Sequence, residues 1–293
     1  YYIPPIRREI DVGSWYAGKV KSLLRGYRAI QTALPSPPRF AIAAADARAI
    51  PVPTESIDYI FTDPPYGDNV QYGELNFVWE AWLRADSDWH ADEIVVNASR
   101  GKSGADWAEA MRRAMAECFR ALKPGRWLTL CYHDTSESRW ASIQDLMAEI
   151  GFQVDGSDGA VSIDTGQKSF NQLMADKATK RDLVFNFRKP RPNERRETKR
   201  RSAIDAEGIE LSVQRIIREY LTKNPIATKD RIYDEVVSRL FRRGEMKAHD
   251  FDALLRSVAD EVEDHLDTKS RRNDERGIAP SPVRWRLKPH AID

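Results

Sequence analysis

Two consecutive prolines stop an apolar run sharply in the first quarter of the chain. The run Ile57–Thr62 has the length and composition of a buried strand, and Asp63-Pro64-Pro65-Tyr66 follows it directly. The prolines fix the backbone and disfavour a continuing strand, so the strand must end here. In open α/β sheets the ligand crevice lies at the carboxyl ends of the strands. This feature therefore predicts an α/β fold with a carboxylate and an aromatic ring at the crevice.

The tetrapeptide resembles the signature of amino-methyltransferases, which transfer a methyl group from S-adenosylmethionine to an exocyclic amine of a base. Its Asp form is similar to that of the adenine-N6 enzymes of DNA modification. The resemblance implies that Asp63 and the Pro64 carbonyl accept hydrogen bonds from the amine, which frees its lone pair for attack. It also implies that Pro65 helps to fix the loop, that Asp63 borders the cofactor, and that Tyr66 stacks on a flipped base. The same residues suit an ordinary surface turn, but their position after a buried strand favours the enzyme.

The segment after the tetrapeptide narrows the resemblance. It is similar to a subgroup of large bacterial DNA methylases, in which a Gly-x-Asn-x-x-Tyr-x-Glu-Leu-Asn pattern and a Trp-Glu-x-Trp helix follow the catalytic loop. The resemblance makes Asn69 and Tyr72 candidate substrate-binding residues and Glu74 a further site candidate. Apolar residues at spacings of 3, 4 and 7 predict a helix face buried in the core, namely Leu75, Val78, Trp79 and Trp82.

The flanking sequence predicts the other elements of such a fold. Residues 40–43 are expected to form a short strand, followed by Asp46. The resemblance places Asp46 at the adenine amine of the cofactor, and a solvated loop carboxylate is an equal alternative. Periodicity and helix-stop signals predict helices at 107–122 and 140–150, strands at 127–132, 152–154 and 183–187, and a helix at 15–34 that packs on the sheet.

A glycine-rich turn is missing from this pattern. In methyltransferases of this kind it follows the first strand, where glycines let the backbone approach the amino-acid end of the cofactor. None of the glycines here forms such a cluster, and the first residue is Tyr1 rather than Met. We therefore expect an incomplete Rossmann-like sheet, whose first strands lie in a missing N-terminal region or in a partner chain. The chain alone should bind S-adenosylmethionine weakly or not at all.

Length, composition and charge limit the kind of protein that this chain can be. At 293 residues, 41% of them hydrophobic and 31% charged, the chain is expected to be a soluble protein of about two domains. A net charge of +1 means that contacts with double-stranded DNA need local basic patches. Cys118 and Cys131 fall on predicted core elements without metal-ligand or disulfide spacing, so no metal is expected. No apolar stretch suits a membrane span, and the cytoplasm is the default location.

The amino-acid composition of the chain changes after residue 189. We expect a catalytic region over 1–189, a basic linker over 190–202 and a helical module over 203–293. Between 191 and 201, six basic residues against two acidic ones give +4, which suits phosphate contact or, slightly better, a solvated hinge. Three apolar helical patterns and an alternating segment at 282–288 predict a winged-helix-like module. Both DNA binding and protein docking remain open for it, and acids between 260 and 267 argue against phosphate contact on that face.

Two polar loops, at 97–104 and 166–169, are candidates for DNA contact or plain surface loops. Taken with the resemblance, the sequence predicts methyl transfer to the N6 amine of adenine in double-stranded DNA. Methylation of cytosine N4 or of another amine is the nearest alternative. A non-catalytic DNA-binding or scaffold fragment that lacks the cofactor half is the other.

Overall fold

The computed structural model describes residues 11–33, 40–85, 87–134, 136–156, 161–164, 181–194, 206–262 and 283–289. It divides into two compact units, Tyr1–Ala45 and Asp46–Asp293. In the first unit, α1 (Val12–Ala33) confirms the helix expected at 15–34, and none of its residues is buried. Its packing on the sheet stays a prediction.

The strand expected at residues 40–43 does not form. These residues have no regular structure, and the side chains of Phe40 and Ile42 are 81% and 90% exposed. A strand needs a neighbour for its backbone hydrogen bonds, and the described residues of the first unit pair with none. The prediction from composition was therefore wrong.

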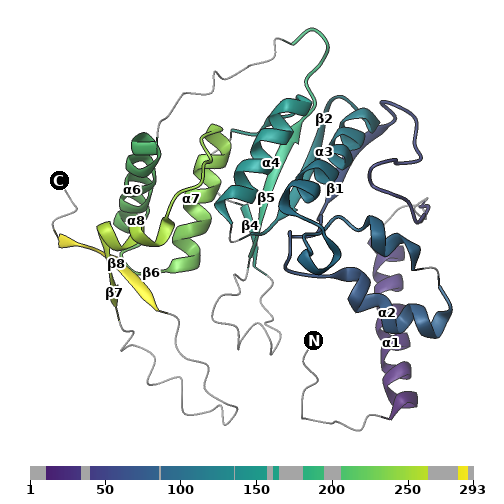
Figure 1. The fold of residues 1–293 in the computed structure, drawn as a ribbon. Helices are drawn as coiled ribbons and strands as arrows, with labels where there is room; N and C mark the ends of the chain where they lie inside the picture. The colour runs from purple at the N-terminus through teal and green to yellow at the C-terminus, as the bar shows by residue number, and fades with distance from the viewer. Residues whose placement is uncertain are drawn as a thin grey trace. The chain divides into compact units, whose positions relative to one another are not determined.

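The second unit is built on a mixed sheet (Figure 1), which confirms the predicted α/β class. Its strand order is β1-β2-β5-β3, with β4 also pairing with β5. β1 runs parallel to β2, whereas β5 is antiparallel to β2, β3 and β4. The strands are β1 (Ile57–Thr62), β2 (Leu122–Tyr132), β3 (Gln153–Val154), β4 (Val161–Asp164) and β5 (Arg181–Arg188).

Two helices bury their apolar faces against one face of this sheet (Figure 1). α3 (Gly104–Ala121) begins at a capping box in which the Ser103 and Asp106 side chains each bond the other's backbone N–H. α4 (Glu137–Ile150) ends at Gly151, whose φ of 109° lies in the left-handed region that favours glycine. The predicted helices at 107–122 and 140–150 are confirmed, and Cys118 and Cys131 are buried free thiols.

The C-terminal part forms the expected winged-helix-like arrangement of three helices and a small antiparallel sheet of order β6-β8-β7. Apolar residues at helical spacing, among them Val213, Ile216, Val236 and Leu240, are fully buried between the helices. The elements are α6 (Ala206–Lys223), β6 (Ala227–Thr228), α7 (Lys229–Arg243), α8 (Phe251–Val258), β7 (Ala259–Val262) and β8 (Arg284–Leu287).

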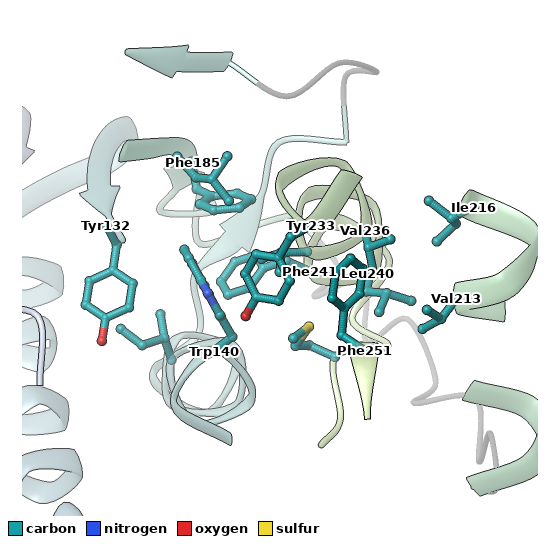
Figure 2. Close-up of a cluster of buried hydrophobic side chains, with 14 of the residues drawn as sticks. Tyr132, Trp140, Phe185, Val213, Ile216, Tyr233, Val236, Leu240, Phe241 and Phe251 are labelled. Carbon is teal, nitrogen blue, oxygen red and sulfur yellow. The ribbon is translucent and has the colours of Figure 1, made fainter. Parts of the chain in front are cut away.

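This module shares a core with the sheet. Phe241 of α7 lies beside Trp140 of α4 and Phe185 of β5, with ring centroids 5.7 Å and 4.3 Å away (Figure 2). The backbone N–H of Met246 also donates to Gln144 Oε1 at 2.8 Å. The boundaries 1–189, 190–202 and 203–293 stay a prediction. Of the basic run only residues 191–194 are described, and the loop at 166–169 lies outside the described residues.

α2 (Tyr72–Leu83) follows the proline loop, and two short 3-10 turns, Asp88–Asp92 and Ala98–Arg100, come after it. The prediction that its apolar face is core was wrong. Leu75, Val78, Trp79 and Trp82 are 47%, 58%, 67% and 82% exposed. The spacing forms the helix as expected, but no described segment covers that face.

The sheet also has an open face and an open edge. β1 is an edge strand among the described strands, and its Tyr59 and Phe61, two residues apart, point to the same face. Trp127 of β2 is the register partner of Tyr59. These three aromatic side chains are 54%, 60% and 39% exposed. No helix in the described part of the chain is long and apolar enough to cross a membrane.

Candidate functional site

The proline loop lies at the carboxyl end of β1, next to the carboxyl end of the parallel strand β2. Asp63 is exposed, Pro64 is buried and Tyr66 is half-buried. The Tyr66 ring packs edge-on against Tyr132, the last residue of β2, at 5.4 Å between centroids. It lies 6.2 Å from the ring of His133. The loop therefore follows a strand, as the sequence predicted, but the prediction that this strand is buried was wrong. None of the six residues of β1 is buried, because β1 is an edge strand among the described strands.

Asp63 and Tyr66 contact each other directly. The Tyr66 hydroxyl donates to Asp63 Oδ1 at 2.5 Å. A hydrogen bond from a hydroxyl to a carboxylate is short and strong, so it ties the ring to the carboxylate. Asp63 keeps its second oxygen and further lone pairs as acceptors. The arrangement can therefore receive a donor group beside the Tyr66 ring.

Gly67 turns the chain directly after the tetrapeptide. It is buried and has a φ of 52°, which favours glycine because other residues pay a steric cost there. Its carbonyl accepts from the N–H of Val96 at 3.0 Å, and the N–H of Asn69 donates to the Tyr66 carbonyl at 2.9 Å. These bonds fix both ends of the turn.

A buried ion pair supports the loop from β2, and the sequence reasoning missed it. Asp134, 0% exposed, accepts from the Tyr132 hydroxyl at 2.8 Å, from the Ser136 N–H at 2.8 Å and from Arg139 Nε at 2.5 Å. Burial raises the pKa of Tyr132, with the Asp134 charge adding to it, so this hydroxyl stays a donor. The signal was present in the sequence, since His133 and Asp134 follow a strand just as Asp63 does.

Asp46 has a partner of its own. Its carboxylate accepts from Arg48 Nε at 3.0 Å, and Arg48 also pairs with Asp92 at 3.1 Å. The hydrogen bond from Arg48 lowers the pKa of Asp46 below its usual value. The carboxylate remains 46% exposed. Its role at the cofactor stays a prediction.

Asn69 lies between the proline loop and α2, Tyr72 is the first residue of α2, and both are exposed. The start of α2 is held by Glu93, which accepts from the Gly73 N–H at 3.1 Å and pairs with Arg100 at 3.0 Å. Glu74, on the first turn of α2, is exposed as well. The structure thus places Asp63 to Asn69 in one loop and Tyr72 at the start of the helix that follows it, and their contacts with a base stay predictions.

A hollow of about 330 Å³ lies on the open sheet face. Tyr59 donates to Thr129 at 2.7 Å and Thr129 to Asn186 at 2.7 Å, and both bonds cross its floor. The tetrapeptide does not line it. Within the described ranges, no three His, Cys, Asp or Glu side chains are placed to hold a metal ion.

The described residues fit only part of a methyl-transfer site. The loop offers acceptors and an aromatic ring for an amine-bearing base. At this edge Gly67 is the buried glycine, and a Cβ there would lie 2.9 Å from Arg139 Nε, so its space is already taken. The described residues of this edge therefore do not provide a glycine-lined approach for the amino-acid end of S-adenosylmethionine.

Comparison with known proteins gives only distant likenesses. No family model matches the chain, and no curated protein matches it. Crystal structures of a Thermus thermophilus protein, provisionally named a DNA modification methylase, align at 18–19% identity with a TM-score of 0.29. They cover 58–60% of this chain and 61–72% of theirs, and one of them is complexed with S-adenosyl-L-methionine. The cyclase SpnF aligns at 14% identity over 51% of this chain and 55% of its own, with a TM-score of 0.27. These similarities are too low to support a common fold.

Proposed function

We propose that this chain forms the base-binding part of a DNA adenine-N6 methyltransferase, with S-adenosylmethionine as the methyl donor. The observation that carries the proposal is Asp63-Pro64-Pro65-Tyr66 at the carboxyl end of β1, beside the end of the parallel strand β2. An exposed carboxylate next to a buried proline and an aromatic ring suits a planar base that carries an amine.

The loop residues have separable roles in this proposal. Asp63 and the Pro64 carbonyl accept the two N–H bonds of the amine, which draws the nitrogen lone pair out of the ring. Pro65 keeps the loop rigid, and Tyr66 supports the flipped base. Because the Tyr66 hydroxyl occupies Asp63 Oδ1, the amine either uses Oδ2 or displaces that hydroxyl.

We further propose that a polypeptide segment outside these 293 residues completes the donor site, either as an N-terminal region or as a partner chain. Parallel strands are normally covered on both faces, whereas no described strand pairs with the outer edge of β1, and the aromatic residues Tyr59, Phe61 and Trp127 are exposed. A segment that adds a parallel strand along β1 and a helix over the exposed aromatic residues would complete the edge, cover this face and bring its glycine-rich turn to the carboxyl end of the sheet.

A methylation assay on the chain expressed with its upstream sequence or neighbouring gene tests the function. Transfer of labelled methyl groups to duplex DNA is followed by chromatography of the nucleosides. N6-methyladenine is the expected product. N4-methylcytosine would instead favour the nearest alternative, and DNA binding without any methyl transfer would favour a scaffold role.

Asp63→Asn tests the site within the same assay. The amide places an N–H donor where the amine needs an acceptor, so we expect methyl transfer to fall by about 10²–10³-fold. Asp58→Asn is the matched control, because Asp58 is an exposed acid on the same strand that pairs with Lys123. Equal activity of the two variants would contradict the role of Asp63.

Isothermal titration of the 293-residue chain with S-adenosylmethionine tests the incomplete donor site. We expect weak binding or none, and a marked gain in affinity once the completing segment is added. Tight binding by the chain alone would contradict this part of the proposal.

A further inference from the structure

We propose that Arg139 is a positioning residue that locks the loop after β1 in the shape required to hold the base. The inference rests on the proposed function for its chemical meaning. The way in which Arg139 on α4 fixes the loop after β1 does not depend on that function and can be tested without it.

The anchor of this lock is the buried carboxylate of Asp134. Its side chain is 0% exposed, and Arg139 Nε is one of its three donors. A buried carboxylate needs a charged partner and filled acceptor positions. The Asp134 backbone carbonyl also accepts from Trp140 Nε1 at 3.0 Å, so the core holds the anchor from both sides. The Nε end of the Arg139 guanidinium is therefore held by a buried and fixed carboxylate.

The other end of the Arg139 guanidinium contacts Asp68 in the loop after β1. Arg139 Nη2 lies 3.1 Å from Asp68 Oδ1, so one side chain bridges the carboxylates that follow β2 and β1. The Arg139 side chain also fills the space beside Gly67, where a Cβ would meet Nε at 2.9 Å and Cδ at 3.0 Å. Gly67 and Asp68 directly follow Tyr66, so Arg139 contacts the first two residues after the proposed catalytic tetrapeptide.

The shape of the guanidinium matters here as much as its charge. The guanidinium is planar and its N–H donors point in fixed directions. Nε can therefore donate to one carboxylate while Nη2 donates to another. A lysine ammonium carries the same charge on a flexible stem and would hold one carboxylate at a time. Only 22% of the Arg139 side chain is exposed, so water competes weakly for these bonds.

Hydrogen–deuterium exchange on the 293-residue chain tests the lock without any need for activity. The probes are the amides of Asn69 and Val96, whose bonds to the Tyr66 and Gly67 carbonyls depend on the loop. The reference is the β2 amide of Leu130. In Arg139→Met we expect loop exchange to rise about tenfold or more relative to the reference. Arg112→Met, which breaks an exposed pair with Glu109, is the control and should leave the ratio unchanged.

A second variant keeps the test decisive if Arg139→Met loosens the whole chain. Asp68→Asn removes only the loop end of the bridge and leaves the buried pair intact. Because Asp68 is 57% exposed, we expect its effect on loop exchange to be smaller, on the order of two- to fivefold. An unchanged ratio of loop to reference exchange in Asp68→Asn would overturn the proposal, as would an unchanged ratio in a stably folded Arg139→Met.

Kinetics of the completed enzyme separate this inference from the proposed function. If Arg139 positions the loop, Arg139→Met lowers kcat while KM for DNA stays within about twofold, and Arg139→Lys restores part of the loss. A rise in KM at constant kcat would assign Arg139 to DNA binding and overturn the positioning role. If the wild-type enzyme transfers no methyl group but Arg139→Met still loosens the loop, the proposed function fails and the lock stands.

Discussion

Replacing Phe241 with alanine should destabilise both the sheet and the C-terminal module. Phe241 is 1% exposed and lies on α7, yet its ring packs on Phe185 and Trp140 and lies 6.0 Å from Phe187. Removing a buried phenylalanine side chain leaves a cavity and costs about 3–5 kcal/mol. The tilted ring contact with Phe185 at 4.3 Å puts this site toward the upper end, because aromatic pairs add about 0.5–1.5 kcal/mol beyond their buried area.

Urea unfolding followed by fluorine NMR of fluorotryptophan-labelled protein measures this effect in both regions. Trp140 reports on α4 and Trp285 on β8, and both are buried. We expect the two signals to disappear together, with the midpoint lowered by about 1 M or more for an m-value of about 3 kcal/mol/M. Leu211→Ala, at a 60% exposed position on α6, is the control and should stay within about 0.5 kcal/mol. Loss of the Trp285 signal at lower urea with an unmoved Trp140 signal would refute the shared core and favour an independent module.

Three further predictions concern single side chains. Ser103→Ala removes the cap of α3 and should lower the unfolding free energy by about 1 kcal/mol in urea titrations. Burial raises the pKa of Glu137 above its ordinary 4.5. The folded chain therefore holds that proton more tightly, and stability should fall as the pH rises from 4.5 through the folded pKa. Glu137→Gln should flatten that part of the pH profile of the unfolding free energy. Burial raises the pKa of Cys118 to about 11, so this thiol should resist alkylation at about pH 8 in the native chain and react once urea unfolds it.

Sequence periodicity and stop signals correctly predicted the elements that are stabilised mainly by residues close together in the sequence. α3 and α4 form where periodicity and helix-stop residues placed them, and Cys118 and Cys131 are buried as expected. The strand that carries the tetrapeptide was predictable for the same reason, because an apolar run ended by prolines admits few conformations, whereas its parallel pairing with β2 was not predicted. A short run such as residues 40–43 is different, since its strand exists only if another strand pairs with it.

Asp134 could have been singled out from the sequence as an acid that follows a strand, but its bridge through Arg139 to Asp68 could not, because the bridge joins three separate segments. Asp68 follows β1, Asp134 follows β2, and Arg139 lies on α4. Their meeting depends on β1 and β2 being parallel neighbours, which places both strand ends at one edge of the sheet. The residue types alone, two acids in polar loops and an arginine near the start of a helix, are what any solvated surface would show.

The exposed apolar face of α2, which was wrongly predicted to be core, and the open face of the sheet have the same physical explanation. A helical spacing of apolar residues shows which side of a helix is stabilised by burial, but burial requires a second surface. Trp79 and Trp82 are 67% and 82% exposed, and Phe61 is 60% exposed on a strand whose outer edge no described strand pairs with. Burying each such side chain would contribute about 1.5–3 kcal/mol, a gain that the described residues of this unit leave unused. A segment that covers these positions would therefore bind with a substantial hydrophobic driving force, and Phe61→Ser or Trp82→Ser should weaken its binding without lowering the stability of the chain alone.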